Sequence, residues 1–143
     1  LFPPTAKLLA LTAYVPQWFA KQASSPGMLD KLLDSTGSVL DDRGKALYAR
    51  LVANPDHAQG ALNMMAAWDL SSGPSVLRQL HCPVHILVGD NDRTVPPAQA
   101  QQALTLLSNG HLKRLAGYGH LVHEEVPLQM VDYLKQIASL RSQ

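Results

Sequence analysis

The segment Pro83-Val-His-Ile-Leu-Val-Gly-Asp-Asn-Asp-Arg-Thr-Val-Pro96 decides how this chain can fold. Its first part is a short apolar run, rich in β-branched residues and closed by Gly89, which is typical of a strand buried on both faces of a parallel sheet. A polar turn follows, and Pro96 and Pro97 then begin a helix, because proline fits the first helical turn. Acidic turns just after a parallel strand are where open α/β sheets place ligands and catalytic groups, although the same residues also make ordinary solvated turns.

A second segment, from Leu115 to Pro127, repeats this order of elements. We expect a strand over residues 111–115, a glycine-rich loop that holds His120, and a helix from Pro127 to about residue 140. A helix over residues 97–108 would separate this strand from the one at 84–88. Strands joined by such a helix pair in parallel with a right-handed crossover, so both loops should leave the same edge of the sheet.

The first half of the chain, residues 1–73, shows apolar residues at helical spacing. Ser25 and Pro26 have the character of a helix start, Asp41 that of an N-cap, and residues 54–56 (Asn-Pro-Asp) that of a break between two helices. Ser71-Ser-Gly-Pro74 follows and marks a boundary. We therefore predict a helical region over 1–73 and an alternating strand and helix region over 74–143.

The overall composition excludes several classes of protein. The chain has 143 residues, 46% of them hydrophobic, with a formal charge of +1, which fits one modest domain and offers no electrostatic footprint for nucleic acid. Its single cysteine, Cys82, fits a reducing compartment such as the cytoplasm, and we expect it to be buried at the entrance of the first strand.

No apolar run reaches the roughly 18 residues that span a bilayer. The nearest, residues 8–20, is broken by Pro16 and is predicted to be a packed helix rather than an interfacial one.

Two spaced patterns resemble the closing half of the α/β-hydrolase family. One is Gly-x-x-Asp-x-x-Val-Pro, carried by Gly89 and Asp92, and the other is Gly-His-x-x-x-x-Glu-x-Pro, carried by His120 and Glu125. The resemblance implies an α/β fold in which residues 1–73 form a helical cap. It also implies a Ser-His-Asp type triad in the chain order nucleophile, acid, histidine. Asp92 would be the acid and His120 the base.

Neighbouring residues leave alternatives open at both positions. Asp90 is the nearest alternative for the acid, and His123 is the nearest alternative for the base. Glu125 is expected to be an acidic residue at a helix N-terminus, where it would interact favourably with the dipole. No cysteine or carboxylate at ligand spacing completes a zinc set with the two histidines, so we predict neither a metal nor a cofactor.

The nucleophile is expected to lie outside this sequence. No Gly-x-Ser-x-Gly motif occurs, and the chain begins at Leu1 rather than at methionine. A serine hydroxyl needs a base within hydrogen-bond reach and a third group that orients the base. We therefore expect this chain to be the C-terminal part of a longer protein and to be inactive as a hydrolase by itself.

Residues 46–70 resemble a narrower group, the BchO family of α/β-hydrolase-like accessory proteins of magnesium chelatase. That resemblance implies a role in inserting magnesium into protoporphyrin IX during bacteriochlorophyll synthesis. A tetrapyrrole would be the substrate and chelatase subunits the partners, and for a ligand this apolar residues 8–19 would be the stretch that touches a membrane surface. Met64, Met65 and Trp68 could line its pocket, although such a stripe is more often ordinary packing.

Two functions therefore stay open at this point. One is a serine hydrolase acting on small esters, and the other is a hydrolase fold that handles a porphyrin or assists a chelatase. The fold alone cannot separate them.

Overall fold

The computed structural model describes residue 21, residue 25 and residues 27–140. The helices expected within residues 1–20, including the apolar stretch 8–20, lie outside the described residues. The elements in chain order are α3 (Met28–Thr36), α4 (Asp42–Val52), α5 (Pro55–Ala67), α6 (Gly73–Arg78), β1 (Val84–Gly89), α7 (Pro97–Leu104), β2 (Gly110–Leu115), α8 (Val122–Glu125) and α9 (Pro127–Leu140).

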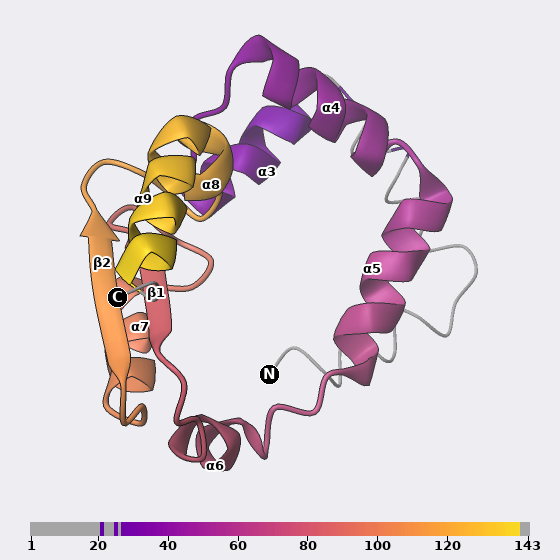
Figure 1. Ribbon diagram of the computed structural model, residues 1–143. Coiled ribbons are helices and arrows are strands. Elements are labelled where there is room, and N and C mark those ends of the chain that lie inside the picture. The colour runs from indigo at the N-terminus through magenta and orange to yellow at the C-terminus, as the bar shows by residue number, and fades with distance from the viewer. Residues whose placement is uncertain (1–20, 22–24, 26, 141–143) are drawn as a thin grey trace.

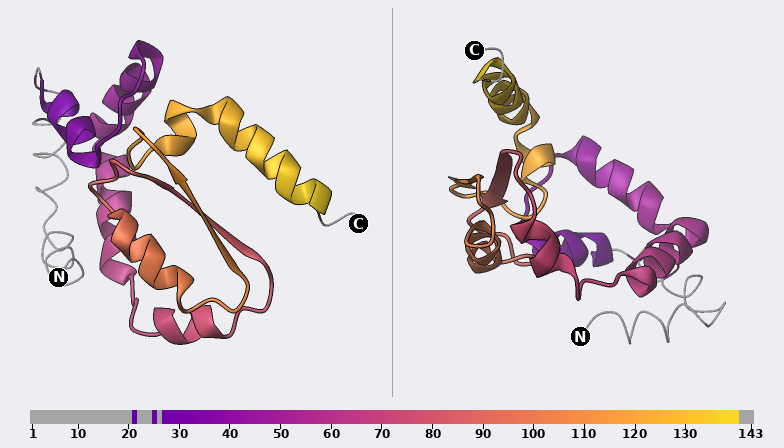
Figure 2. Two further views of the ribbon diagram at one scale, coloured as in Figure 1. Left: turned by 90° about the vertical axis from the view of Figure 1, so that its left-hand side faces the viewer. Right: turned by 60° about the horizontal axis from the view of Figure 1, so that its bottom comes forward.

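The two strands pair in parallel, as predicted. Their register sets Val84 opposite Gly110 at one end and Gly89 opposite Leu115 at the other. Helices α7 and α9 lie on opposite faces of the pair (Figures 1 and 2). The expectation of complete burial was too strong, because in β1 only Val88 and Gly89 are buried and the four residues before them are half-buried. Within the described residues the sheet has two strands, so one edge of each strand has no neighbour in the sheet.

Helices α3, α4 and α5 form what we call the helical arm, residues 28–67. The arm arcs away from the sheet and returns to β1 through α6 (Figure 1). Asp41 caps α4 as predicted, because its side chain accepts a hydrogen bond from the Gly44 N–H at 2.7 Å. Asn54 caps α5 in the same way, accepting from the Asp56 N–H at 2.9 Å. Gly37 ends α3 in the left-handed conformation, with φ of 75°.

The predicted boundaries of three helices were wrong. Helix α3 begins at Met28 rather than at Pro26, with Gly27 as its N-cap and no side-chain cap, so Ser25 is not the capping residue. Helix α7 ends at Leu104 rather than at residue 108, because the N–H groups of Leu106 and Leu107 bond to carbonyls three residues back instead of four. Trp68 follows α5 in extended conformation and is not part of that helix.

The buried apolar residues fall on both parts of the chain. They are Leu33, Leu40, Val52 and Ala58 in the helical arm, and Val88, Ala100, Leu115 and Val122 around the sheet. Cys82 is exposed, contrary to the expectation, because it lies in the turn before β1 rather than within the strand. Among the described residues, none of the helices is long and apolar enough to cross a membrane.

Candidate active site

Asp92 lies in the turn that follows β1 and is held there by the backbone around it. Its N–H donates to the Gly89 carbonyl at 3.1 Å. Its Oδ1 accepts two hydrogen bonds, from the N–H of Thr94 at 2.9 Å and from that of Val95 at 2.8 Å. This is the local turn that aspartate side chains favour. The carboxylate is 7% exposed, so its orientation is fixed in a nearly buried position.

The second carboxylate oxygen of Asp92 is directed at His120. The distance from Asp92 Oδ2 to His120 Nδ1 is 2.9 Å. A proton on Nδ1 donated to the carboxylate leaves Nε2 with its lone pair, and Nε2 is then the atom that can accept a proton from a nucleophile. The imidazole is 36% exposed, which leaves one side of the ring accessible.

The two alternative residues have other partners. Asp90 forms an ion pair with Arg114, whose Nε lies 2.7 Å from Asp90 Oδ1. His123 is 64% exposed, and its Nε2 lies 3.5 Å from a carboxylate oxygen of Glu124. The structure therefore brings together Asp92 and His120, and it directs Asp90 and His123 elsewhere.

Three glycines allow the loops of this site to approach one another closely. A Cβ atom on Gly89 would overlap the carbonyl oxygens of Tyr118 and Gly119. A Cβ atom on Gly119 would overlap the backbone of Gly37, and one on Gly37 would overlap the carbonyl of Asn91. The turn after β1, the loop before His120 and the end of α3 are therefore stacked backbone against backbone.

The end of α3 also bonds to both loops. The Thr36 carbonyl accepts the N–H of Arg93 at 3.3 Å and the N–H of His120 at 3.1 Å. Arg93 follows Asp92 directly, so one carbonyl holds the backbone next to the acid and the backbone of the base. The Asn91 N–H donates to the Tyr118 carbonyl at 2.9 Å and joins the two loops to each other. Sequence reasoning missed Thr36, because the bond partners are remote in the chain.

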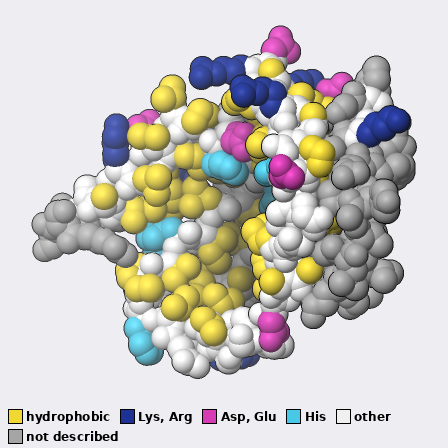
Figure 3. Space-filling view, turned by 90° about the vertical axis from the view of Figure 1, so that its right-hand side faces the viewer, with side chains coloured by type: hydrophobic (Ala, Val, Ile, Leu, Met, Phe, Trp, Pro, Cys, Tyr) yellow, Lys and Arg dark blue, Asp and Glu magenta, His cyan; other side chains and the backbone are white. Residues whose placement is uncertain are grey.

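A cavity of about 300 Å³ adjoins the imidazole of His120. The residues that line it are mostly apolar and come from β1, α8, α9 and the histidine loop: Leu87, His120, Val122, His123, Met130, Tyr133 and Leu134. On the face drawn in Figure 3, apolar side chains surround a hollow with histidine and acidic side chains near its rim.

Of the three residues predicted to line a substrate pocket, Met64 and Met65 lie on the helical arm and Trp68 follows its last residue; none of them lines this cavity. Met64 is 54% exposed and Trp68 is 46% exposed, whereas Met65 is half-buried. Within the described residues, Met64 and Trp68 are therefore not packed into the interior of the arm. Their apolar surfaces are open to a ligand or to another part of the protein.

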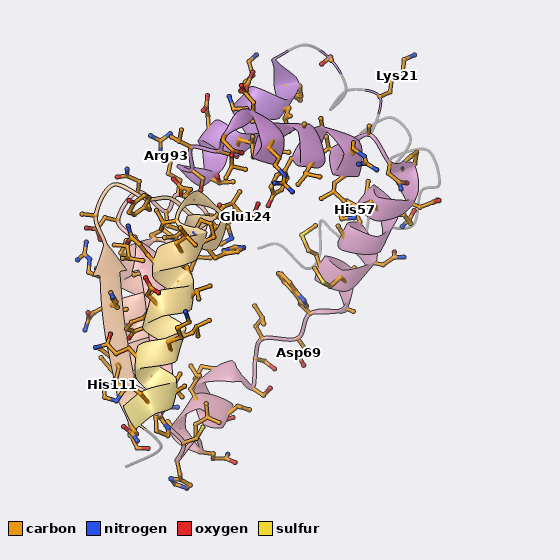
Figure 4. The ribbon with its side chains drawn as sticks, turned by 45° about the horizontal axis from the view of Figure 1, so that its top comes forward. Lys21, His57, Asp69, Arg93, His111 and Glu124 are labelled. Atoms are coloured by element: carbon orange, nitrogen blue, oxygen red, sulfur yellow. The ribbon has the colours of Figure 1, made fainter. Side chains whose placement is uncertain are left out.

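A hydrogen bond from Tyr48 joins the arm to α8. The Tyr48 hydroxyl donates to Glu124 Oε1 at 2.7 Å, and Figure 4 shows Glu124 facing the arm. Burial, together with the hydrogen bond to Glu124 and the negative charge of Glu124, raises the pKa of Tyr48 to about 12. The phenol therefore stays protonated and keeps donating throughout the neutral pH range.

Two other histidines lie away from the candidate pair. His85 and His111 are opposite each other in the strand register, and their rings stack with centroids 4.6 Å apart. His85 Nδ1 also lies 3.2 Å from the Tyr133 hydroxyl. In Figure 4, His111 is at the opposite end of the sheet from Glu124. Within the described ranges, no three His, Cys, Asp or Glu residues gather closely enough to hold a metal ion.

The class of protein follows from three features of the fold and site. They are a parallel strand pair, an aspartate turn after the first strand and a histidine loop after the second. The chain belongs to the alpha/beta hydrolase family, whose family pattern it matches over residues 1–133. The chain is also similar to the magnesium-chelatase 30 kDa subunit of Rhodobacter capsulatus, to which it is 37% identical over 124 residues. The match covers 87% of this chain and 43% of that relative, so the chain spans less than half the relative's length. Both resemblances predicted from the sequence are confirmed.

Proposed function

We propose that this chain supplies the acid and the base of a Ser-His-Asp type site, with the nucleophile contributed from outside these 143 residues. The observation that carries the proposal is the 2.9 Å bond between Asp92 and His120, whose acid is itself fixed by two backbone donors. In this proposal the helical arm belongs to a cap over residues 1–73, and residues 74–143 belong to the core.

The geometry supports a defined set of proton transfers. His120 Nε2 takes the hydroxyl proton of the nucleophile as its oxygen attacks a carbonyl carbon, and Asp92 stabilises the imidazolium that results. The same proton then passes to the leaving group as its bond to carbon breaks. A water molecule repeats the sequence and releases the acid product. Asp92 keeps the Nδ1 proton directed toward itself, so Nε2 remains the reacting nitrogen.

We further propose that the whole protein assists magnesium insertion into protoporphyrin IX. The similarity to a magnesium-chelatase subunit supports this role. The exposed side chains of Met64 and Trp68 also suit a large, flat, apolar ligand better than a small polar ester. Subunits of the chelatase are the partners that this role requires. Contact of residues 8–19 with a membrane surface, the alternative to a packed helix there, concerns residues outside the described part.

The test is a gene deletion in a bacterium that makes bacteriochlorophyll. Loss of the protein should lower magnesium protoporphyrin while protoporphyrin IX persists, and the wild-type gene should restore it. Complementation with His120→Ala separates the two parts of the proposal: failure to restore would show that acid–base chemistry is needed. Full restoration by His120→Ala would show that the accessory role does not need acid–base catalysis by His120.

Simple ester hydrolysis is the competing function, and the intact Asp92–His120 pair favours it. Unchanged tetrapyrrole levels in the deletion strain would contradict the accessory role. Brisk hydrolysis of a p-nitrophenyl ester by the purified full-length protein, abolished by His120→Ala, would then assign a general hydrolase.

A further inference from the structure

The carboxylate of Glu125 joins two parts of the molecule. Its Oε1 accepts the N–H of Gly119 at 2.7 Å, and its Oε2 accepts the N–H of Val39 at 3.1 Å. Gly119 directly precedes His120, whereas Val39 belongs to the helical arm, 86 residues away from Glu125 in the chain. The sequence predicted for Glu125 only a favourable interaction with a helix dipole, and it did not predict these two backbone contacts.

These bonds belong to a set that holds three consecutive N–H groups of the histidine loop. Gly119 donates to Glu125, His120 donates to the Thr36 carbonyl at 3.1 Å, and Leu121 donates to Ser38 Oγ at 2.8 Å. Ser38 is 3% exposed, so its bond lies out of water. Each of the three acceptors is in the arm or, through Glu125, is bonded to the arm.

A carboxylate suits this position because both of its partners are donors. Each oxygen of a carboxylate can accept an N–H, and charge-assisted bonds of this kind are roughly twice as strong as neutral ones. A glutamine has one accepting oxygen and one NH₂ group. At position 125 it could satisfy Gly119 or Val39, and it would place its NH₂ against the N–H of the other.

We propose that Glu125 is a positioning residue for His120, fixing the histidine loop against residues 36–39 of the arm so that the imidazole keeps its orientation toward Asp92 and the nucleophile. This inference rests on the proposed acid–base role of His120. The start of the arm is accordingly part of the catalytic framework, and the arm does not swing freely from the core at this point.

The experiment compares Glu125→Gln with Glu124→Gln in the full-length protein. The changes are chemically identical and adjacent, but Glu124 accepts the hydroxyl hydrogen of Tyr48 and lies 3.5 Å from the exposed His123 Nε2, and a glutamine oxygen can serve both contacts. With a p-nitrophenyl ester, Glu125→Gln should lower kcat roughly 10²-fold, the scale of a small misplacement of a catalytic group, and leave KM within about twofold. Glu124→Gln should leave both constants within about twofold of wild type.

Proton NMR gives a second readout that does not require turnover. The proton shared by His120 Nδ1 and Asp92, assigned by its loss in His120→Ala, should shift upfield or broaden in Glu125→Gln and stay in place in Glu124→Gln. If the wild-type protein hydrolyses no ester, the hydrolase function fails, and the NMR comparison still decides the positioning role. An unchanged resonance in a folded Glu125→Gln protein would overturn it.

Ser38→Ala provides the same test if Glu125→Gln does not fold. It removes the acceptor of the third of the three loop N–H groups, that of Leu121. It should shift the same resonance and lower kcat in the same direction. A folded Ser38→Ala protein with wild-type kcat and an unchanged resonance would contradict the positioning of His120 by the arm.

Discussion

Asp92 Oδ2 lies 2.9 Å from His120 Nδ1, although 28 residues separate the two in the chain. The strand register explains the distance. Gly89 is opposite Leu115 at the carboxyl ends of β1 and β2, so the turn holding Asp92 and the loop holding His120 leave the sheet at one edge. The consequences of this arrangement can be tested one residue at a time.

Replacing Asp92 by asparagine should lower kcat of the full-length protein by about 10⁴ if the protein is a hydrolase, because the amide no longer selects the imidazole tautomer that accepts a proton at Nε2. The measurement is steady-state hydrolysis of an activated ester. Asp90→Asn is the matched control, since Asp90 pairs with Arg114 and should leave kcat close to wild type. Equal losses in the two variants would contradict the assignment of Asp92 as the acid.

Alanine at Gly119 should destabilise the fold by about 1–3 kcal/mol, because the new Cβ meets backbone atoms that cannot rotate away. Gly60→Ala is the control. Gly60 lies inside α5 with no atom within 4 Å of a Cβ built there, so alanine should stabilise the protein by roughly 0.5–1 kcal/mol. Urea unfolding followed by circular dichroism measures both changes. A neutral Gly119→Ala variant would mean that the loops are not in backbone contact.

The Tyr48 phenol should ionise near pH 12, above its ordinary value of 10.0. The folded state then binds this proton more tightly than the unfolded state. The associated stability is complete below pH 10 and is lost as the pH rises toward 12. Titration at 295 nm, read as the difference between wild type and Tyr48→Phe, reports the ionisation of this residue. A difference curve centred near pH 10 would show that the bond to Glu124 is not made.

Trp68→Ala and Met64→Ala should each weaken binding of protoporphyrin IX to the full-length protein about threefold or more, if these exposed side chains cover an apolar ligand. Absorbance titration of the porphyrin measures the affinity. Leu128→Ala is a suitable control, because Leu128 is an exposed apolar residue of α9, 79% accessible, away from the arm. Equal affinities in all three variants and wild type would remove these residues from the proposed pocket.

Local patterns were sufficient to predict the order of elements around the sheet. A β-branched run closed by glycine, a proline pair and a glycine-rich loop each restrict the backbone within a few residues. Asp41 and Gly37 likewise mark helix ends by their own chemistry. The prediction failed at the start of α3 and at the end of α7. Backbone hydrogen bonds set these two helix ends, and such bonds leave no pattern in the side chains.

The sequence by itself determined the parallel strand order and indicated Asp92 and His120, because motif spacing and secondary structure are short-range properties of the chain. Only the tertiary structure decided that Asp90 turns to Arg114, that Trp68 lies outside α5, and that Glu125 and Thr36 hold the histidine loop. Contacts such as that between Glu125 and Val39 join positions 86 residues apart. Their partners meet only once the arm has packed against the sheet edge, so no local pattern reports them.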